Sequence, residues 1–222
     1  MKRTGYAALL MILVIGLLTG CGKEADADTN TVSVAKNGKI TSYDFEEFDK
    51  SYYDEDELKK FIDGAVEDYN AGHEKGAVKA DEVSVTDNVA KLKMTYKTAA
   101  DYEEFSGTEL YTGKVVQAMA DGYDFDVDFA GIDGDNVYGV TKSDITSQED
   151  LKVVIIKANT NVRVDGKICY VSCKNVTVTG KNTISVREGT GIEQTWKSEA
   201  VPSTEDVTED TEEFVVEGEV IM

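Results

Sequence analysis

The second half of this 222-residue chain consists of short apolar runs separated by turn-forming residues. Between Val137 and Arg187 the runs are rich in Val and Ile, which favour strands. Asp165-Gly166, Lys174-Asn175 and Gly180-Lys181-Asn182 interrupt them, and residues of these types mark turns. The pattern therefore predicts a region made almost entirely of strands and turns.

The predicted strands of this region are Val137–Val140, Leu151–Ala158, Val162–Val164, Lys167–Ser172, Val176–Thr179 and Thr183–Arg187. The run Val153–Ile156 has no polar residue, which is typical of a strand buried on both faces. Just upstream, residues 123–129 (YDFDVDF) alternate apolar with acidic side chains. We expect a strand there, with one apolar and one acidic face.

The first half carries the strongest helical pattern, over residues 54–71. Asp54 can cap this helix and Gly72 can end it. Its predicted apolar face consists of Leu58, Phe61, Ile62, Ala65, Val66 and Tyr69. Two hairpins are also expected: residues 32–43 with a type I′ turn at Asn37-Gly38, and residues 82–97 with a turn at Asp87-Asn88.

Shorter helices are predicted over 99–105, with Thr98 as the N-cap, and over 112–121, with Thr112 as the N-cap. Helices in the first half followed by strands in the second indicate an α+β fold. We expect a mainly antiparallel sheet with a few short helices in the N-terminal half. Residues 31–197 are predicted to form one α+β domain.

The first twenty residues have the pattern of a targeting signal. Lys2 and Arg3 precede an apolar run of thirteen residues, Tyr6–Leu18. That length suits the apolar core of a signal peptide and falls short of the roughly 20 residues that a spanning helix needs. Residues 1–20 are therefore predicted to be a signal peptide and not an element of the fold.

Leu18-Thr19-Gly20-Cys21 follows directly and resembles the lipobox of bacterial lipoproteins. The resemblance implies that a type II signal peptidase cuts after Gly20. Cys21 would then be the first mature residue and would carry a diacylglycerol thioether with fatty-acyl chains such as palmitate. This implies a protein anchored by lipid at the extracytoplasmic face of the cell membrane. The alternative is an ordinary secretory signal with an incidental cysteine.

Residues 22–30 (GKEADADTN) are small, polar and charged, so we interpret residues 21–30 as a lipidated tether. In the second half, Leu151–Ile156, Val162–Ser172 and Asn175–Thr183 resemble a group of lipoproteins from Gram-positive anaerobic bacteria. That group implies no activity. It supports the prediction of a lipid-anchored exterior protein.

The chain has 43 acidic and 23 basic residues, a formal net charge of −20. Loss of residues 1–20 removes Lys2 and Arg3 and leaves −22. Because phosphate binding requires clustered Lys and Arg, we expect no nucleic-acid partner. An anionic lipid surface would also repel the chain, so the lipid on Cys21 must supply the affinity for the membrane.

The C-terminal segment 198–222 holds nine acidic residues and no Lys or Arg. This composition predicts a disordered acidic tail. The alternative is one additional strand, formed by the apolar stretches Phe214–Val216 and Val220–Met222.

The whole chain has one histidine, His73. One histidine therefore leaves little basis for a Ser-His-Asp triad or for a metal site with several histidine ligands. His73 follows the predicted helix directly, and we interpret it as a surface or capping residue. Glu46, Glu47 and Asp49 could supply a glycosidase-type carboxylate pair, but a chain with 43 acidic residues contains close pairs by chance.

Five acidic residues are candidates for a cation site: Asp124, Asp126, Asp128, Asp133 and Asp135. On one strand face the first three would be about 6.6 Å apart, too far to share one ion from a rigid strand. The EF-hand pattern fails because Phe129 stands where Gly is required. Our interpretation is a solvated strand face that leads into a turn, and we expect no cofactor.

Cys169 and Cys173 are four residues apart. On one strand they would be separated by about 13 Å, whereas a disulfide needs Cα atoms within about 7 Å. An extracytoplasmic location favours a disulfide, which would require a sharp bend. Two buried thiols and a disulfide are therefore both open interpretations, with the thiols as the simpler one.

Trp196 and Tyr170 would form a sugar- or peptide-binding patch only if the fold brings them together, and core packing is the simpler interpretation. No catalytic residue is predicted. We expect a lipid-anchored, non-catalytic protein that binds or scaffolds a protein or cell-wall ligand. One alternative is a small cell-surface hydrolase or cell-wall-modifying enzyme that uses carboxylates. The other is a transporter substrate-binding lipoprotein, although two closing lobes usually need more than about 170 folded residues.

Overall fold

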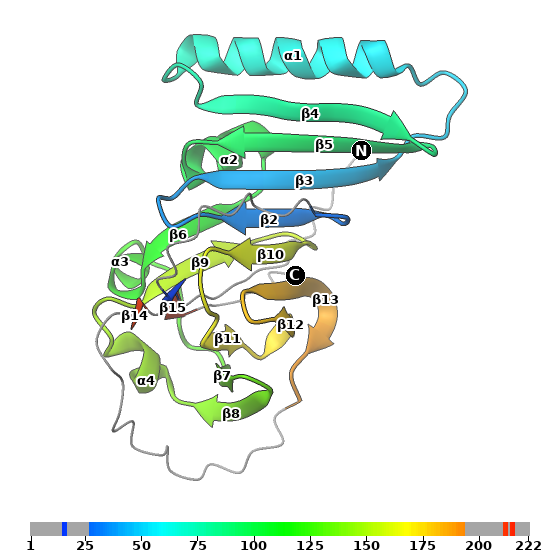
Figure 1. The fold of residues 1–222 in the computed structure, drawn as a ribbon. Coiled ribbons are helices and arrows are strands. Elements are labelled where there is room, and N and C mark those ends of the chain that lie inside the picture. Colours follow the sequence, from blue (N-terminus) through cyan, green and yellow to red (C-terminus); the bar gives the residue numbers. More distant parts are fainter. Residues whose placement is uncertain (1–14, 17–26, 194–210, 213, 216–222) are drawn as a thin grey trace, which may run out of the picture. The chain divides into compact units, whose positions relative to one another are not determined.

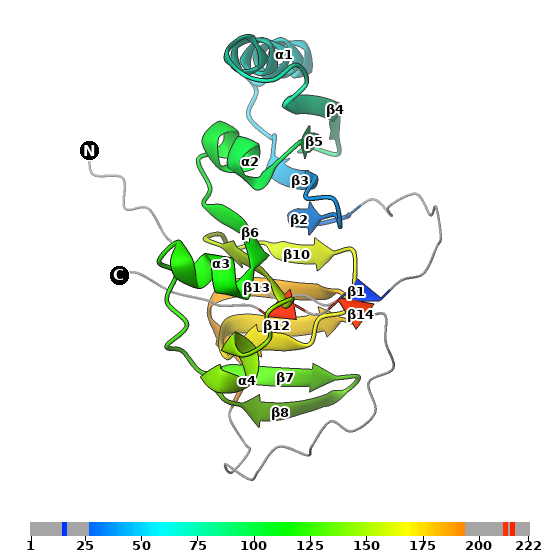
Figure 2. The ribbon, with the colours of Figure 1, turned by 90° about the vertical axis from the view of Figure 1, so that its left-hand side faces the viewer.

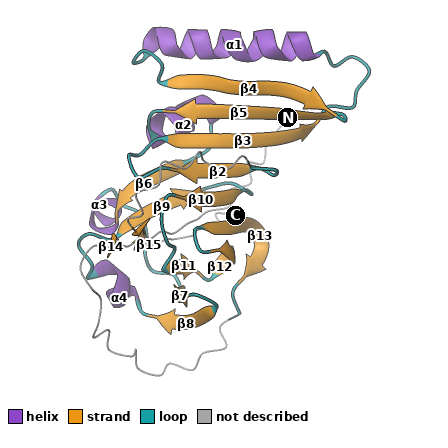
Figure 3. Cartoon of the chain, viewed as in Figure 1, coloured by secondary structure: helices purple, strands orange, loops and turns teal. Residues whose placement is uncertain are grey.

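The computed structural model describes residues 15–16, 27–193, 211–212 and 214–215. Within these residues the fold is α+β with predominantly antiparallel strand pairing, which confirms the predicted fold class (Figure 3). The chain divides into two compact units, residues 22–108 and residues 109–222 together with 1–21. The division falls inside the range 31–197, for which the sequence predicts one domain.

The unit 22–108 contains four antiparallel strands and two helices. Its strands lie in the order β2-β3-β5-β4, as Figure 1 shows. The elements are β2 (Thr31–Val34), β3 (Ile40–Glu47), α1 (Glu55–Gly72), β4 (Val78–Thr86), β5 (Val89–Tyr96) and α2 (Ala99–Ser106).

Both predicted hairpins of this unit are present, but their turns differ. Asp87 and Asn88 have positive φ angles of 51° and 61°, as a type I′ turn requires. In the β2–β3 hairpin Gly38 has a φ of 83° and Asn37 has a negative φ, so the predicted type I′ turn is wrong. Asn37 Oδ1 instead accepts a hydrogen bond from the Lys39 N–H (3.1 Å), which stabilises a longer loop.

Both helices of this unit begin where the sequence predicts. Asp54 Oδ1 accepts a hydrogen bond from the Glu57 N–H (2.9 Å) at the start of α1. Thr98 and Asp101 form a reciprocal capping box at the start of α2. The two helices lie on the same side of the sheet (Figure 2), and the rings of Tyr69 and Phe105 are 5.5 Å apart.

The apolar face of α1 is less covered than the sequence predicts. The helix packs mainly on one strand, β4, and no residue of α1 is buried. Phe61, predicted to be on the packed face, is one of the most exposed apolar side chains in the described residues. That assignment is wrong because the apolar stripe is wider than the surface that one edge strand can cover.

The unit containing residues 109–222 is built from small sheets. Its longer strands are β6 (Leu110–Lys114), β7 (Phe129–Asp133), β8 (Asn136–Val140), β9 (Lys152–Ile156), β10 (Asn161–Val164), β11 (Tyr170–Ser172), β12 (Lys174–Gly180) and β13 (Thr183–Gly191). They pair antiparallel as β11-β7-β8, β6-β9 and β12-β13-β10. As predicted, all four residues from Val153 to Ile156 in β9 are at most 1% exposed.

Two helices also lie in this unit, so the prediction that helices are confined to the N-terminal half is wrong. They are α3 (Val115–Ala120) and α4 (Lys142–Thr146) (Figure 3). The α4 helix was not predicted, although Thr141 and Asp144 form a capping box at its start. Thr112, the predicted cap of α3, instead pairs with Val154 in the β6–β9 ladder.

The predicted strand over residues 123–129 is also wrong, since regular pairing begins only at Phe129. The alternation of burial persists: Phe125 and Phe129 are buried while the intervening acidic residues are exposed. Asp124 Oδ1 accepts a hydrogen bond from the Asp126 N–H (2.8 Å). A local side-chain acceptor of this kind competes with strand pairing for the backbone donor.

The predicted terminal segments are described only in part. Asn30, at the end of the predicted tether, accepts a hydrogen bond from the Phe45 N–H at Oδ1 (2.7 Å) and so belongs to the folded unit. Cys21, Trp196, most of residues 1–20 and most of 198–222 lie outside the described residues. No helix in the part of the chain that is described is long and apolar enough to cross a membrane.

Three short strands fall in the predicted signal peptide and tail. They are β1 (Ile15–Gly16), β14 (Thr211–Glu212) and β15 (Phe214–Val215). β1 pairs antiparallel with β14, and β15 pairs parallel with β9. Phe214–Val215 lies in the first of the two apolar stretches named for an additional strand, whereas Val220–Met222 lies outside the described residues.

Candidate functional site

Residues 48–54, between β3 and α1, form a turn that carries three aromatic rings, and we call it the aromatic turn. The Tyr53 N–H donates to the Lys50 carbonyl (3.0 Å), and the Phe48 N–H donates to the Asn88 carbonyl (2.7 Å). These bonds hold the turn against the tip of the β4–β5 hairpin. The Phe48 and Tyr53 rings stack at 4.7 Å, and Tyr52 packs edge-on against Tyr53 at 5.0 Å.

Two of these rings and a third on α1 are open to solvent. The exposed fraction is 75% for Tyr52, 43% for Tyr53 and 72% for Phe61. Phe61 is four residues from Glu57, so the two side chains are neighbours on one side of α1. Single exposed apolar residues are ordinary, but Tyr52 and Tyr53 are exposed rings in contact with each other, which is typical of an interaction site.

The aromatic turn lies within a strongly acidic stretch. Residues 44–57 contain eight acidic residues and one basic residue, Lys50. Lys50 is ion-paired with Asp49, and Lys59 is paired with Glu55 at 2.5 Å. The other exposed carboxylates around the turn are those of Glu46, Glu47, Asp54, Asp56 and Glu57. The exposed rings are therefore surrounded by negative charge.

His73 connects the two helices of the same unit. Its Nδ1 donates to the Tyr69 carbonyl (2.8 Å) and its Nε2 lies 3.1 Å from Glu104 Oε2. The imidazole stacks on the Tyr69 ring with centroids 3.9 Å apart. The Tyr69 hydroxyl is itself 3.3 Å from Asp101 Oδ1. His73 therefore ends α1 and ties it to α2, as the capping interpretation expects.

These contacts shift two pKa values. The hydrogen bond to the Tyr69 carbonyl, reinforced by Glu104, raises the pKa of His73. Burial, with the negative charges of Asp101 and Glu104, raises the pKa of Tyr69 to about 12. The imidazolium is thus stabilised in the folded chain while the phenol stays neutral.

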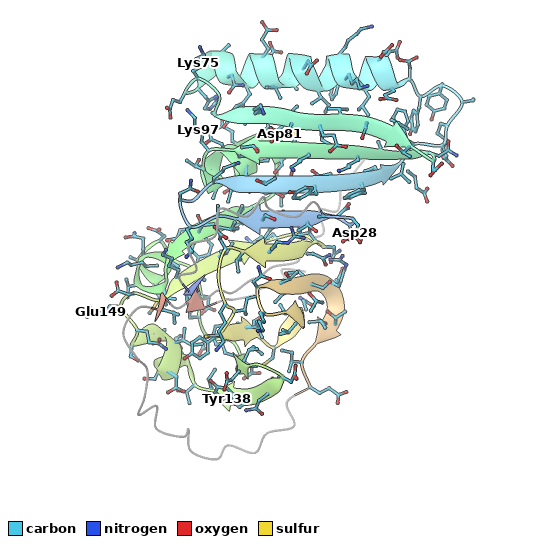
Figure 4. The ribbon with its side chains drawn as sticks, in the orientation of Figure 1. Asp28, Lys75, Asp81, Lys97, Tyr138 and Glu149 are labelled. Atoms are coloured by element: carbon cyan, nitrogen blue, oxygen red, sulfur yellow. The ribbon has the colours of Figure 1, made fainter. Side chains whose placement is uncertain are left out.

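The loop after α1 is tied to the end of β5 by Lys97. Lys97 Nζ donates to the Lys75 carbonyl (2.8 Å) and lies 2.9 Å from a carboxylate oxygen of Glu74. Figure 4 shows Lys75 and Lys97 together at this end of the unit. The loop that follows α1 is therefore held by polar contacts to Lys97.

Asp44 is a half-buried carboxyl on β3. Ser42 Oγ donates to Asp44 Oδ2 (2.8 Å). Burial raises the pKa of Asp44, the hydrogen bond from Ser42 opposes that shift, and Glu46 adds to it. Glu46 lies two residues along β3, so both carboxyls point to the same face of the sheet.

The five candidate residues for a cation site do not form one cluster. The first three, Asp124, Asp126 and Asp128, precede β7, whereas Asp133 and Asp135 lie at its far end and in the turn to β8. Asp126 is 3.8 Å from Lys142 Nζ, and Asp133 is 3.5 Å from Lys167 Nζ. Within the described residues, no three His, Cys, Asp or Glu side chains are grouped as metal ligands would be.

Cys169 and Cys173 flank β11 and are thiols in the structure, the first half-buried and the second buried. The Cys169 carbonyl accepts from the Ile132 N–H (2.6 Å), and the Cys173 N–H donates to the Asp128 carbonyl (2.8 Å). Their backbones thus hold β11 in place, and the choice between two buried thiols and a disulfide stays a prediction.

The remaining candidates are dispersed. Glu46 and Glu47 lie exposed at the end of β3, and Asp49 is ion-paired with Lys50. The Tyr170 hydroxyl is 3.1 Å from Gln148 Nε2. None of the sequence-predicted residues lies among the exposed rings of the aromatic turn. The available signal was the pair Tyr52-Tyr53 directly before the helix cap, in a segment with no predicted strand or helix to bury it.

Comparison with protein-family models, curated proteins and solved structures finds no match to this chain.

Proposed function

We propose that this protein is a lipid-anchored, extracytoplasmic lipoprotein that binds a partner at the cell surface. The anchoring part rests on Leu18-Thr19-Gly20-Cys21 and on the apolar run before it. The acidic body opposes adhesion to anionic lipid, so the acyl chains on Cys21 supply the holding force, at about 0.8 kcal/mol per buried CH₂.

The binding part rests on one observation, the exposed rings of the aromatic turn and of Phe61 on α1. Tyr52 and Phe61 each leave more than 70% of their surface in water in the described unit. Leaving apolar area in water forgoes about 25 cal/mol for each Å² that burial would gain. A partner that covers these rings recovers this energy, which supports a binding role for the surface around α1.

Anchoring is tested with Cys21→Ser. We expect the variant to lose metabolic labelling by a fatty-acid analogue and to be released from cells. Retention and labelling of the variant would show that the lipobox assignment is wrong.

Binding is tested by photo-crosslinking in the intact cell, with a photoreactive amino acid at position 52 or 61. Position 137 is the control because Val137 is also exposed but lies on β8. We expect one specific adduct at positions 52 and 61 and none at 137. Equal adducts at all three positions, or none, would contradict a binding site at the aromatic turn.

A second candidate function is a cell-surface hydrolase that uses carboxylates. One observation favours it: Asp44 has a pKa raised by burial, and Glu46 shares its face of β3. A half-buried carboxyl with a raised pKa and a second carboxyl on the same strand face are the kinds of group that a general acid and its partner require. Asp44→Asn should then abolish hydrolysis of cell-wall glycan by the folded protein. Absence of hydrolysis by the wild type, or full hydrolysis by the variant, would exclude this function.

A further inference from the structure

We propose that the aromatic turn and the first two turns of α1 form a docking surface for an arginine-rich basic segment of a partner protein. We call this surface the aromatic–acidic surface and define it by Tyr52, Tyr53, Asp56, Glu57 and Phe61. The inference rests on the proposed binding function and names the class of partner.

The exposed aromatic rings favour a cationic partner. The π-face of an exposed aromatic ring attracts a cation within about 6 Å of its centroid. Arginine is the cation that best uses such a ring, because its planar guanidinium stacks on the face while its N–H groups stay available for hydrogen bonds. Tyr52 and Phe61 present this kind of surface, since about three quarters of each side chain is in solvent.

The carboxylates near the rings can bind the same guanidinium group. Glu57 and Phe61 are one helical turn apart on α1, so a guanidinium stacked on the Phe61 ring can reach the Glu57 carboxylate. An arginine and a carboxylate can then form two parallel charge-assisted hydrogen bonds. Two of the nearby lysines are already paired, Lys50 with Asp49 and Lys59 with Glu55, while Lys60 is exposed next to Phe61.

The negative charge of the chain distinguishes among the partners that could bind the aromatic–acidic surface. A second copy of this chain carries the same net charge of −20 and presents the same acidic stretch, so it is repelled. Anionic lipid and nucleic acid are repelled for the same reason. Electrostatic complementarity therefore favours a basic protein segment, which can cover the rings and neutralise the carboxylates together.

The test measures binding of fluorescent nona-arginine to the full-length protein in nonionic detergent at about 0.15 M salt, where long-range attraction is screened. The double variant Tyr52→Ala/Phe61→Ala keeps the net charge. We expect about tenfold weaker binding for it, the combined loss of two exposed cation–π contacts. Nona-lysine should bind the wild type more weakly than nona-arginine.

Two matched controls separate the rings from general hydrophobicity. Tyr52→Phe/Phe61→Tyr keeps both rings and should bind within about twofold of the wild type. Val116→Ala/Met119→Ala removes two apolar side chains of α3, each 42% exposed, and should also bind within about twofold.

A charge-matched pair separates the surface from diffuse attraction. Asp56→Asn/Glu57→Gln and Asp135→Asn/Glu149→Gln remove the same two charges, the second pair from exposed positions elsewhere. We expect about fivefold weaker binding for the first pair and less than about twofold for the second. Equal weakening by the two pairs, or wild-type binding by Tyr52→Ala/Phe61→Ala, would overturn the proposal.

The peptide-binding and photo-crosslinking experiments together distinguish a failure of this inference from a failure of the proposed function. One outcome is that nona-arginine binds Tyr52→Ala/Phe61→Ala as tightly as the wild type while photo-crosslinking at positions 52 and 61 still traps a specific partner. In that case the binding role stands and the basic partner is rejected. If both experiments fail, both proposals are rejected. A cooperative urea transition for each variant verifies that it is folded, with a modest decrease in midpoint expected only for Asp56→Asn/Glu57→Gln, which removes two charges from the first turn of α1.

Discussion

The side-chain amide of Asn70 makes both outward-facing backbone hydrogen bonds of Val78. Asn70 Nδ2 donates to the Val78 carbonyl (2.8 Å), and Asn70 Oδ1 accepts from the Val78 N–H (3.1 Å). Val78 begins β4, the terminal strand of its sheet. At this point a side chain of α1 takes the place of a neighbouring strand, which fixes the helix to the sheet although no α1 residue is buried.

Asn70→Ala should therefore destabilise the unit 22–108. The change leaves the N–H and the carbonyl of Val78, a residue 1% exposed, without these partners. Each unsatisfied buried group costs about 1–3 kcal/mol, so we expect a loss of about 2 kcal/mol in the free energy of unfolding. Urea denaturation measures the loss, and hydrogen exchange at the Val78 amide should accelerate with it.

The control for this change is Asn37→Ala. Asn37 also accepts a backbone hydrogen bond, from Lys39, but it lies in an exposed loop where water can replace it. We expect a loss below about 0.5 kcal/mol. If the two variants lose equal stability, the Asn70 amide does not hold the sheet edge.

His73 should make the stability of the unit depend on pH. Its folded pKa is raised above the ordinary 6.5, so its contribution is fully present below pH 6.5 and is lost as the pH rises through the folded pKa. The groups that face it are Tyr69, Asp101 and Glu104. The Tyr69 phenol, with a pKa of about 12, stays neutral throughout this range, so the imidazole is the group that titrates.

The measurement compares urea midpoints of the wild type and His73→Gln from about pH 5 to pH 9. The wild type should be the more stable protein at the acidic end, and the difference should shrink as the pH rises. Glu104→Gln should reduce the same pH dependence, because it removes the charge that favours the imidazolium. Parallel curves for the wild type and His73→Gln would contradict the role of this contact.

Asp44→Asn should stabilise the folded chain at neutral pH. The raised pKa of Asp44 means that stability falls as the pH rises from 3.8 through the folded pKa, because burial penalises the ionised form. Asparagine keeps an acceptor for Ser42 and does not ionise. The gain in unfolding free energy over the wild type should be present at pH 7 and largely absent at about pH 3. A variant that is less stable at pH 7 would refute this assignment.

Gly191→Ala should destabilise the end of β13. A Cβ at position 191 would lie 2.6 Å from the Cys173 carbonyl oxygen, a backbone atom that also accepts from the Ile192 N–H at 2.8 Å. The backbone must shift to admit the methyl group, and overpacking of this kind costs about 1–3 kcal/mol. Thermal denaturation of the variant and the wild type measures the loss.

Gly64→Ala is the matched control, and it should change the stability in the opposite direction. A Cβ at position 64, in the middle of α1, has nothing within 4 Å. Alanine also favours the helix by about 1 kcal/mol over glycine, so the variant should be more stable than the wild type. A gain for Gly191→Ala would show that the close approach at Cys173 is not a constraint.

Elements with a strong local signal were predicted well. Asp54 and Thr98 cap their helices as expected, and the Asp87-Asn88 turn joins β4 and β5. The errors arise where two local preferences compete. Thr112 can cap a helix, but it forms the β6–β9 ladder, because pairing with the buried β9 satisfies its backbone.

The candidate site was not predicted, because exposure is not a local property. A helical pattern shows that Phe61 shares a face with Leu58 and Ile62, but it does not show how wide the covering surface is. Tyr52 and Tyr53 lie outside any helical or strand pattern of apolar residues. Their packing depends on the Phe48 ring and on the β4–β5 hairpin. The acidic candidates for a cation site do not come together, because β7 separates Asp128 from Asp133.

The sequence by itself determined the α+β class, most strands, the helix caps and the acidic charge, because these depend on neighbouring residues and on composition. It also carries the lipobox that ends at Cys21, which stays a prediction. Only the tertiary structure decided that α1 packs mainly on one strand, β4, and that Asn70 meets Val78 across the sheet edge. It alone showed that Tyr52 and Phe61 remain open, because burial depends on which distant surface the chain brings to each side chain.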